Sequence, residues 1–341
     1  MPRSRSRHPR HQFLTPLLAP AFADVPFTVV DVGAAGGIAD KWRRLPVPVR
    51  VLAFDPGAHA PDTAGDDGRV TVQWYPVALG AEPGTRTLHL TRKAECSSFF
   101  EPNQELLDRF DDAARFDVIA TEPVVVDTLD RVVEAAGRPP VDILKMDVQG
   151  AALDVLAGAQ HCLAAGVLGI EVEAEMMPLY VGEPLFADVD AVLRDQGFEL
   201  FDLNPVYWKR RAGPRHVQAK GQMAFADALY FRDPGWLDER LRAAPTAAAR
   251  RALASRMAVA YLSHGYVDAA GAVLAAVADD MDQSDRALMS RLASGRFGLS
   301  RLRRAMSGRR RHALSAMLAD LLDPAYQSPG TLGGRLGNPR D

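Results

Sequence analysis

The stretch Thr28-Val-Val-Asp-Val-Gly-Ala-Ala-Gly-Gly37 decides the expected fold. Its first part, with Phe27 in front, is apolar and β-branched, which is typical of a strand buried on both faces of a parallel sheet. A turn of small residues follows from Gly33. Such a turn lets a ligand approach the backbone closely, because no side chain stands in the way. The glycine spacing is similar to that of the dinucleotide-binding turn, but Asp31 stands where that turn begins with glycine.

Asp31 changes the ligand that the turn is expected to bind. A carboxylate repels phosphate and attracts cations, so a ligand with an ammonium or sulfonium group is favoured. S-adenosylmethionine (SAM) carries both groups. A second carboxylate, Asp55, ends the next apolar run and lies 22 residues after Gly33. That distance is close to the roughly 20 residues expected for an acidic residue that binds ribose hydroxyls. The alternative is that Asp55 only caps the following turn.

Strands alternate with helices up to about residue 233, which indicates a doubly wound α/β sheet. In such sheets the ligand lies beyond the carboxyl ends of the strands. Asp31, Asp55, Asp147 and Glu173 all lie at such ends. The predicted strands are residues 27–32, 50–55, 70–79, 85–91, 123–127, 141–147, 167–173, 198–203 and 223–231, with a hairpin between the third and the fourth. The predicted helices are residues 39–45, 103–110, 129–136, 150–163 and 186–196.

Five segments resemble those of the FkbM family of class I SAM-dependent methyltransferases. They are residues 30–37 (Val-Asp-Val-Gly-Ala-Ala-Gly-Gly), 53–56 (Ala-Phe-Asp-Pro), 128–130 (Thr-Leu-Asp), 144–151 (Leu-Lys-Met-Asp-Val-Gln-Gly-Ala) and 170–173 (Ile-Glu-Val-Glu). The Lys-x-Asp-x-x-Gly pattern after Thr-Leu-Asp is the most specific to the family. The resemblance covers residues 27–233. It implies a Rossmann-like, mostly parallel seven-stranded sheet and methyl transfer from SAM to an oxygen, often on a sugar or polyketide hydroxyl.

The resemblance also implies roles for particular residues. Asp31 and Gly33, with Gly36 in the same turn, would face the methionine part of SAM. Asp55 would bind the ribose, and Ala78 would lie near the adenine.

One position departs from the family pattern. The family usually has glutamate two residues after the glycine of the Lys-x-Asp segment, where this chain has Ala152. Altered acceptor chemistry, or an inactive protein that binds SAM or a glycan, therefore stays an alternative.

A hydroxyl acceptor loses a proton on methylation, so a base within hydrogen-bond reach is expected. Asp147 is the first candidate and Glu173 the second. Glu171, Glu173 and Glu175 alternate and so share one face of a strand, where mutual repulsion would raise a pKa. Lys145 points the same way as Asp147, either to neutralise that carboxylate or to orient substrate. Mg²⁺ binding is an alternative for the acids, but the spacing typical of metal ligands is missing, so we expect no metal.

The composition changes near residue 234 to helix rich in alanine, arginine and leucine. Two similar helical hairpins follow, with Gly265 and Gly295 at equivalent positions. We expect a basic, partly disordered arm and lead-in over residues 1–24 and a methyltransferase domain over residues 25–233. A helical domain, the C-terminal appendage, would cover residues 234–326, and residues 327–341 would form a disordered tail.

Composition limits the setting and the partners. The two cysteines, Cys96 and Cys162, form no disulfide or metal pattern, which favours the reducing cytoplasm. No apolar run is long enough to span a bilayer. Eight arginines and no acid between Arg291 and Arg311 suggest an anionic partner and, as a rival function, nucleic-acid methylation. A solvated helix face is the other interpretation. The acceptor's identity and the oligomeric state, including a homo-oligomer, stay open.

Overall fold

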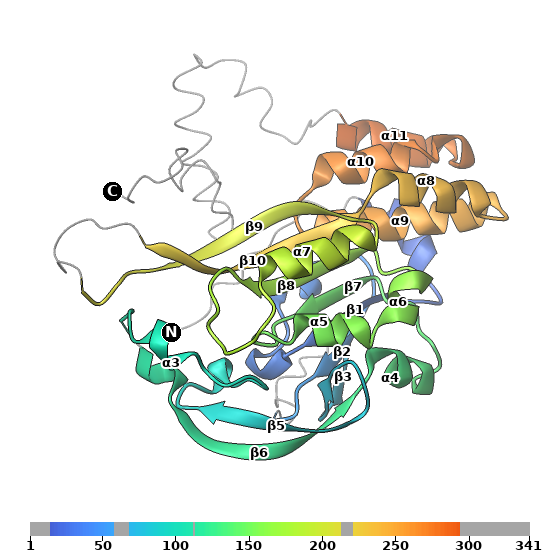
Figure 1. Ribbon diagram of the computed structural model, residues 1–341. Coiled ribbons are helices and arrows are strands. Elements are labelled where there is room, and N and C mark those ends of the chain that lie inside the picture. Colours follow the sequence, from blue (N-terminus) through green and yellow to red (C-terminus); the bar gives the residue numbers. More distant parts are fainter. Residues whose placement is uncertain (1–13, 58–67, 112, 213–220, 294–341) are drawn as a thin grey trace, which may run out of the picture.

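The computed structural model describes residues 14–57, 68–111, 113–212 and 221–293. Its centre is a seven-stranded sheet with the order β3-β2-β1-β7-β8-β10-β9 (Figure 1). Six of these strands run in the same direction, and only β10 runs against them, antiparallel to both of its neighbours. The strands are β1 Phe27–Val32, β2 Val49–Phe54, β3 Val70–Tyr75, β7 Ile143–Met146, β8 Gly169–Glu175, β9 Phe198–Trp208 and β10 Gln222–Arg232. The predicted α/β fold with a mostly parallel seven-stranded sheet is confirmed.

Strand order reverses between β1 and β7, which are adjacent and parallel. The chain leaves β1 toward β2 on one side and returns through β7 on the other. The crevice outside the carboxyl ends at such a switch point is where open α/β sheets bind ligands. The turn after Asp31 and the residues after β7 therefore meet at this edge.

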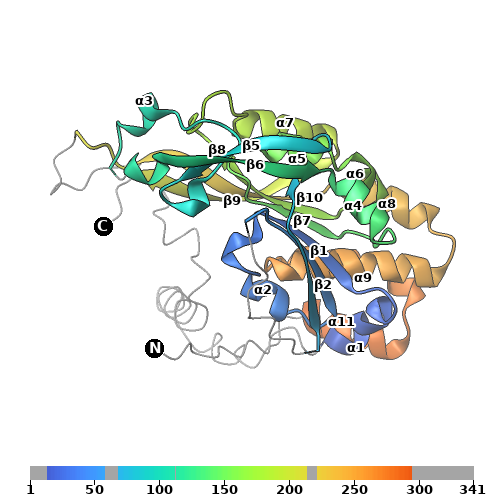
Figure 2. The same ribbon diagram turned by 90° about the horizontal axis from the view of Figure 1, so that it is seen from below.

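Both faces of the large sheet are covered by helices (Figure 2). Side chains of β1 alternate between two cores, with Val29 in one and Val30 in the other. The Val29 face packs against α1 Thr15–Leu18, α2 Asp40–Arg43, α8 Pro234–Ala243, α9 Ala247–Ser263 and α10 Val267–Ala275, with α11 Gln283–Ala293 outside them. The Val30 face packs against α4 Leu129–Ala135, α5 Ala152–Ala157, α6 Gln160–Ala165 and α7 Phe186–Asp195.

A second, three-stranded sheet differs from the prediction. The expected strand over residues 70–79 is two strands, because the chain leaves the large sheet at Pro76, which has no N–H for a ladder. The expected hairpin is wrong. Instead β5 Gly84–Thr91 pairs antiparallel with β6 Val118–Asp127, and β6 lies between β5 and β4 Ala78–Leu79. The partner of β5 is thus more than 25 residues away along the chain.

The expected helix over residues 150–163 is divided into α5 and α6. Between them lies Gly158, where an added Cβ would meet the carbonyl oxygen of Gly80 at 2.1 Å. The loop after β4 therefore packs directly onto the break. The other predicted helices are present, with slightly shorter bounds, including a single turn, α3 Gln104–Leu107.

The helical region after residue 233 shares a core with the sheet. In α9, Met257 and Ala258 are fully buried in the cluster that holds Val29 of β1. Arg256 of the same helix binds Asp142 at the start of β7 through two hydrogen bonds of 2.7 and 2.6 Å. The first predicted hairpin is present as α9 and α10. The second hairpin's later helix and the predicted tail lie outside the described residues, as do the side chains of the arginine cluster. The domain boundary at residue 233 stays a prediction.

Candidate functional site

The turn after β1 has the shape of a ligand cradle. Gly33 adopts a left-handed conformation with φ of 80°, and Gly37 has φ of 84°. At Gly36 and Gly37 a Cβ would meet nothing within 4 Å, so the backbone there faces open space. Gly33 itself is tightly packed, because its amide donates to the Phe54 carbonyl of β2. The turn is thus fixed at Gly33 and open at Gly36 and Gly37, which suits close approach by a ligand.

Asp31 presents a buried carboxylate beneath this turn. Its side chain is fully buried, and Oδ1 accepts a hydrogen bond of 2.8 Å from Lys145 Nζ on β7. Its second oxygen, Oδ2, is buried without a hydrogen-bond partner among the described residues. Burial raises the pKa of Asp31, and the Lys145 charge offsets only part of that effect. A second cationic or N–H donor at Oδ2 would therefore be stabilising.

Asp55 and Ala78, the residues predicted to lie near the ribose and the adenine, have different surroundings. Asp55 follows β2, is half-buried, and accepts a hydrogen bond of 2.9 Å from the Gly57 amide. Asp55 thus caps its own turn. Ala78 is buried in β4, where it pairs with Val126 of β6.

Asp147 lies directly against the glycine turn. Its amide donates to the Val32 carbonyl at 3.0 Å, and a Cβ added at Gly33 would lie 1.9 Å from the Asp147 carbonyl oxygen. Only glycine fits this contact. The Asp147 side chain is exposed at the carboxyl edge of the sheet.

Gln149 holds Asp147 and Glu173 together. Its Nε2 donates to Asp147 Oδ1 at 2.9 Å and also to Glu173 Oε1. Its Oε1 in turn lies 2.8 Å from the hydroxyl of Tyr180, and Ser98 Oγ donates to its carbonyl. Gln149 has a positive φ of 47°, which is uncommon for a residue other than glycine. A strained, fully bonded residue of this kind fixes the two carboxylates relative to each other.

The acids around Gln149 resist ionisation. Burial, with the charges of Asp147 and Glu175 added, raises the pKa of Glu173 to about 9. Burial and Glu183 likewise raise the pKa of Glu175. Burial raises the pKa of Glu183 to about 8, although its Oε1 accepts a hydrogen bond from the Tyr180 amide. The predicted face of alternating glutamates is thus present on β8, and Glu173 is protonated at neutral pH.

Glu171, the third alternating glutamate, behaves differently. Burial acts to raise its pKa, but the hydrogen bond to His264 and the charge of Lys41 outweigh burial and lower that pKa well below its usual range. Lys145 forms an ion pair with Asp31, and Lys41 forms one with Glu171. Each of these two lysines is therefore paired with an acid of the sheet.

A small hydrophobic core covers the acidic residues. It is built on Tyr180, which is fully buried, and on the aromatic cluster of Phe110, Phe116 and Trp208. Tyr180 lies in the loop between β8 and α7. The other residues come from the segment around α3 and from the extended ends of β9 and β10, which reach beyond the large sheet (Figure 1). The candidate site is therefore bounded on one side by the carboxyl ends of the strands and on the other by this small hydrophobic core.

Residues 31–200 match the methyltransferase FkbM domain family. The chain belongs to the FkbM methyltransferase family. Among solved structures, the crystal structure of methyltransferase FkbM from Methylobacillus flagellatus KT is similar over 62% of this chain and 45% of that chain. The sequence identity is 13% and the TM-score 0.31, and this chain spans less than half of that protein. A search of curated proteins found no match.

The position where the FkbM pattern was expected to carry glutamate lies inside the core. Ala152 begins α5 and is buried in the cluster that contains Met146, Val155 and Leu156. Its methyl group therefore packs under the sheet, away from solvent.

Several residues near the candidate site were not identified from sequence. Gln149 lies within the segment that carries the resemblance, but its bridging role depends on a backbone conformation. Asp227 faces Glu173 from β10, a pairing that follows only from strand register. His264, far along the chain from both partners, contacts Lys41 and Glu171.

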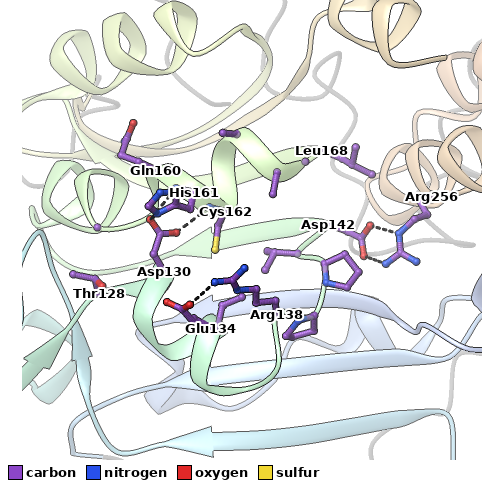
Figure 3. A pocket seen from close by; sticks show the side chains of 18 of the residues that line it. Thr128, Asp130, Glu134, Arg138, Asp142, Gln160, His161, Cys162, Leu168 and Arg256 are labelled. Atoms are coloured by element: carbon purple, nitrogen blue, oxygen red, sulfur yellow. Dashed lines mark hydrogen bonds and ion pairs between the residues drawn. The ribbon is translucent and has the colours of Figure 1, made fainter. Parts of the chain in front are cut away.

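A large cleft lies away from this site. It has a volume of about 1420 Å³ and lies between α4, α6, α8 and α9, at the amino ends of β7 and β8 (Figure 3). Its acids are engaged: Asp142 binds Arg256, Glu134 binds Arg138, and Asp130 accepts from the amide of His161. We place the candidate site at the carboxyl edge because the open turn and the orphaned carboxylate oxygen lie there.

Two further observations concern metals and membranes. Within the described residues, His, Cys, Asp and Glu side chains form no group of three or more with the arrangement of a metal site. In the same part of the chain, the helices are too short or too polar to cross a membrane.

Proposed function

We propose that this protein is a SAM-dependent O-methyltransferase that acts on a neutral hydroxyl acceptor, such as a saccharide or a related natural product. The observation that carries the proposal is the packing of Asp147 against Gly33. It sets an exposed carboxylate beside the turn that suits the cofactor, at the switch point of the sheet. A base and a cofactor cradle are thus neighbours.

The residues at the turn fit SAM. The unpartnered Oδ2 of Asp31 would accept a hydrogen bond from the ammonium group, next to Lys145 on Oδ1. The open backbone at Gly36 and Gly37 leaves room for the methionine part, and Asp55 is available for the ribose hydroxyls. SAM, when bound, supplies an electrophilic methyl group on its sulfonium.

The chain's own residues would then position the acceptor and remove its proton. Asp147 would accept the proton of the acceptor hydroxyl, since its carboxylate is exposed and anchored by Gln149. Glu173, protonated below a pKa of about 9, would donate a hydrogen bond to a second acceptor oxygen. The rate gain expected from this arrangement comes from alignment more than from the base.

The acids around the site favour a neutral acceptor. Asp147, Glu173, Glu175, Glu183 and Asp227 cluster there, and the nearby Lys145 is held by Asp31. The raised pKa values of Glu173 and Glu183 mean that further negative charge is unfavourable in this cluster, which disfavours a phosphate and so nucleic acid as the acceptor. Hydroxyl groups, which donate and accept hydrogen bonds, match carboxyl groups well. SAM is made inside cells, so we expect the reaction in the cytoplasm, by a protein that is active alone or as a homo-oligomer.

An inactive SAM- or glycan-binding protein is the second candidate, since Ala152 replaces an acid of the family pattern. The pairing of Asp147 with Glu173 through Gln149 favours activity over this alternative, because two carboxyl groups remain at the site, one to accept a proton and one to donate a hydrogen bond.

Replacing Asp147 with asparagine separates the two candidates. We expect Asp147→Asn to lower kcat by a factor on the order of 10² to 10⁴ while the Kd for SAM stays within about twofold. The assay measures conversion of SAM with a panel of neutral glycans. Asp195→Asn, an exposed aspartate at the end of α7, controls for loss of one negative charge. Unchanged turnover in Asp147→Asn would remove Asp147 as the base.

A further inference from the structure

A partly buried polar triad joins the C-terminal helical region to the candidate cofactor site. It consists of Lys41 on α2, Glu171 on β8 and His264 directly after α9. Lys41 forms an ion pair with the Glu171 carboxylate. His264 Nε2 lies 3.2 Å from Glu171 Oε2 and 3.2 Å from Lys41 Nζ. Only 9% of the His264 side chain is exposed, so the imidazole is part of the packed interior.

Strand register sets this triad in line with Asp31. Asp31 of β1 is paired with Lys145 of β7, and Lys145 is paired with Glu171 of β8. Directly paired residues on neighbouring strands point to the same face. The three side chains therefore form one polar row on the face that α9 covers. Within the row, Lys145 binds Asp31. At the other end, Lys41 and His264 contact Glu171.

The short helix α2, which follows the cofactor turn, depends on these contacts. It has four residues and no side-chain cap at Ala39, and a single turn does not offset its own nucleation cost. Its anchors are the buried Trp42 and the ion pair of Lys41. His264 touches both, because its ring meets the Trp42 ring edge to face at 5.8 Å between centroids.

The turn before α2 is packed at its start and open in its second part. Gly33 is fixed by the Phe54 carbonyl and packs on Asp147, whereas a Cβ at Gly36 or Gly37 would face open space. The second part of the turn therefore takes its position from α2, which follows it.

We propose that His264 is a positioning residue of the candidate cofactor site. Through Lys41 and Trp42 it fixes α2 and thereby the turn over residues 33–39 that precedes it. The inference rests on the proposed SAM site. It makes the helical region after residue 233 a part of that site, since one of its residues determines where the cofactor turn lies.

Three variants of the full-length protein test this role. His264→Leu keeps bulk and removes both ring nitrogens, His264→Gln keeps a polar donor and acceptor, and Met257→Ala removes buried volume from α9 away from the triad. Hydrogen exchange of residues 33–43 reports on the turn, and calorimetry gives the Kd for SAM. Thermal unfolding measures the general loss of stability.

We expect His264→Leu to speed exchange over residues 33–43 and to raise the Kd for SAM about tenfold. His264→Gln should restore both toward the wild-type values. Met257→Ala should lower Tm without changing exchange in that segment. Unchanged exchange in His264→Leu, or an equal change in Met257→Ala, would overturn the proposal. If the wild-type protein binds no SAM, the proposed function fails, while the exchange data still decide the positioning role.

Discussion

Replacing Glu173 with glutamine is expected to make the protein more resistant to alkaline pH. Burial and the neighbouring carboxylates raise the pKa of Glu173 from 4.5 to about 9. Between these values the folded protein holds a proton at Glu173 that the unfolded chain has released. The free energy of unfolding therefore falls as pH rises through this range. Glutamine binds no proton, so the variant does not undergo this loss.

The pKa shift sets the size of the effect. A rise from 4.5 to about 9 corresponds to at most about 6 kcal/mol, at about 1.4 kcal/mol per pKa unit. The acids raise one another's pKa values, so one substitution recovers only part of this energy. Gln149 can still donate to the new amide oxygen. We expect Glu173→Gln to gain about 2 kcal/mol over the wild type between pH 5 and pH 9.

Urea unfolding followed by circular dichroism at pH 5, 7 and 9 measures the difference. Glu82→Gln, at an exposed glutamate, controls for the change in net charge. The reasoning is refuted if the stability difference between Glu173→Gln and the wild type is the same at pH 5 and pH 9.

Two other substitutions test the packing on which the site depends. Gly33→Ala should cost several kcal/mol, because of the left-handed φ and the clash with the Asp147 carbonyl, whereas Gly36→Ala should be tolerated in open space. Thermal unfolding compares the two, and equal Tm values would contradict the contact. Arg256→Leu should cost about 3–5 kcal/mol, since it leaves Asp142 buried without its charge partner. Urea unfolding measures this, and a loss below about 1 kcal/mol would show that Asp142 is not held by Arg256.

The large sheet was predictable because each of its strands has a strong local pattern. The run before Gly33 is mostly apolar and β-branched, as expected of a strand with helices on both faces, and β1 is buried throughout. The same pattern predicted carboxylates at the ends of the strands, so the positions of Asp31 and Asp147 could be predicted from the sequence. The parallel neighbours β1 and β7 then brought them together.

The features that the sequence did not predict are pairings between distant parts of the chain. The β5 strand was expected to pair with the strand just before it, because hairpins are local, but its partner is β6. Likewise His264 is 93 residues from Glu171 along the chain, and no spacing rule links them. The roles of Gln149 and Asp227 depend on a backbone angle and on sheet register, which side-chain patterns do not reveal.

Titration calorimetry with SAM tests the central claim most directly. We expect the wild-type protein to release or absorb heat on binding SAM, and Asp31→Asn to bind about tenfold more weakly, because Oδ2 would lose its charge. A thermal unfolding scan first confirms that the variant is folded at the titration temperature. No heat and no thermal shift with the wild type, or equal affinity in Asp31→Asn, would contradict the account.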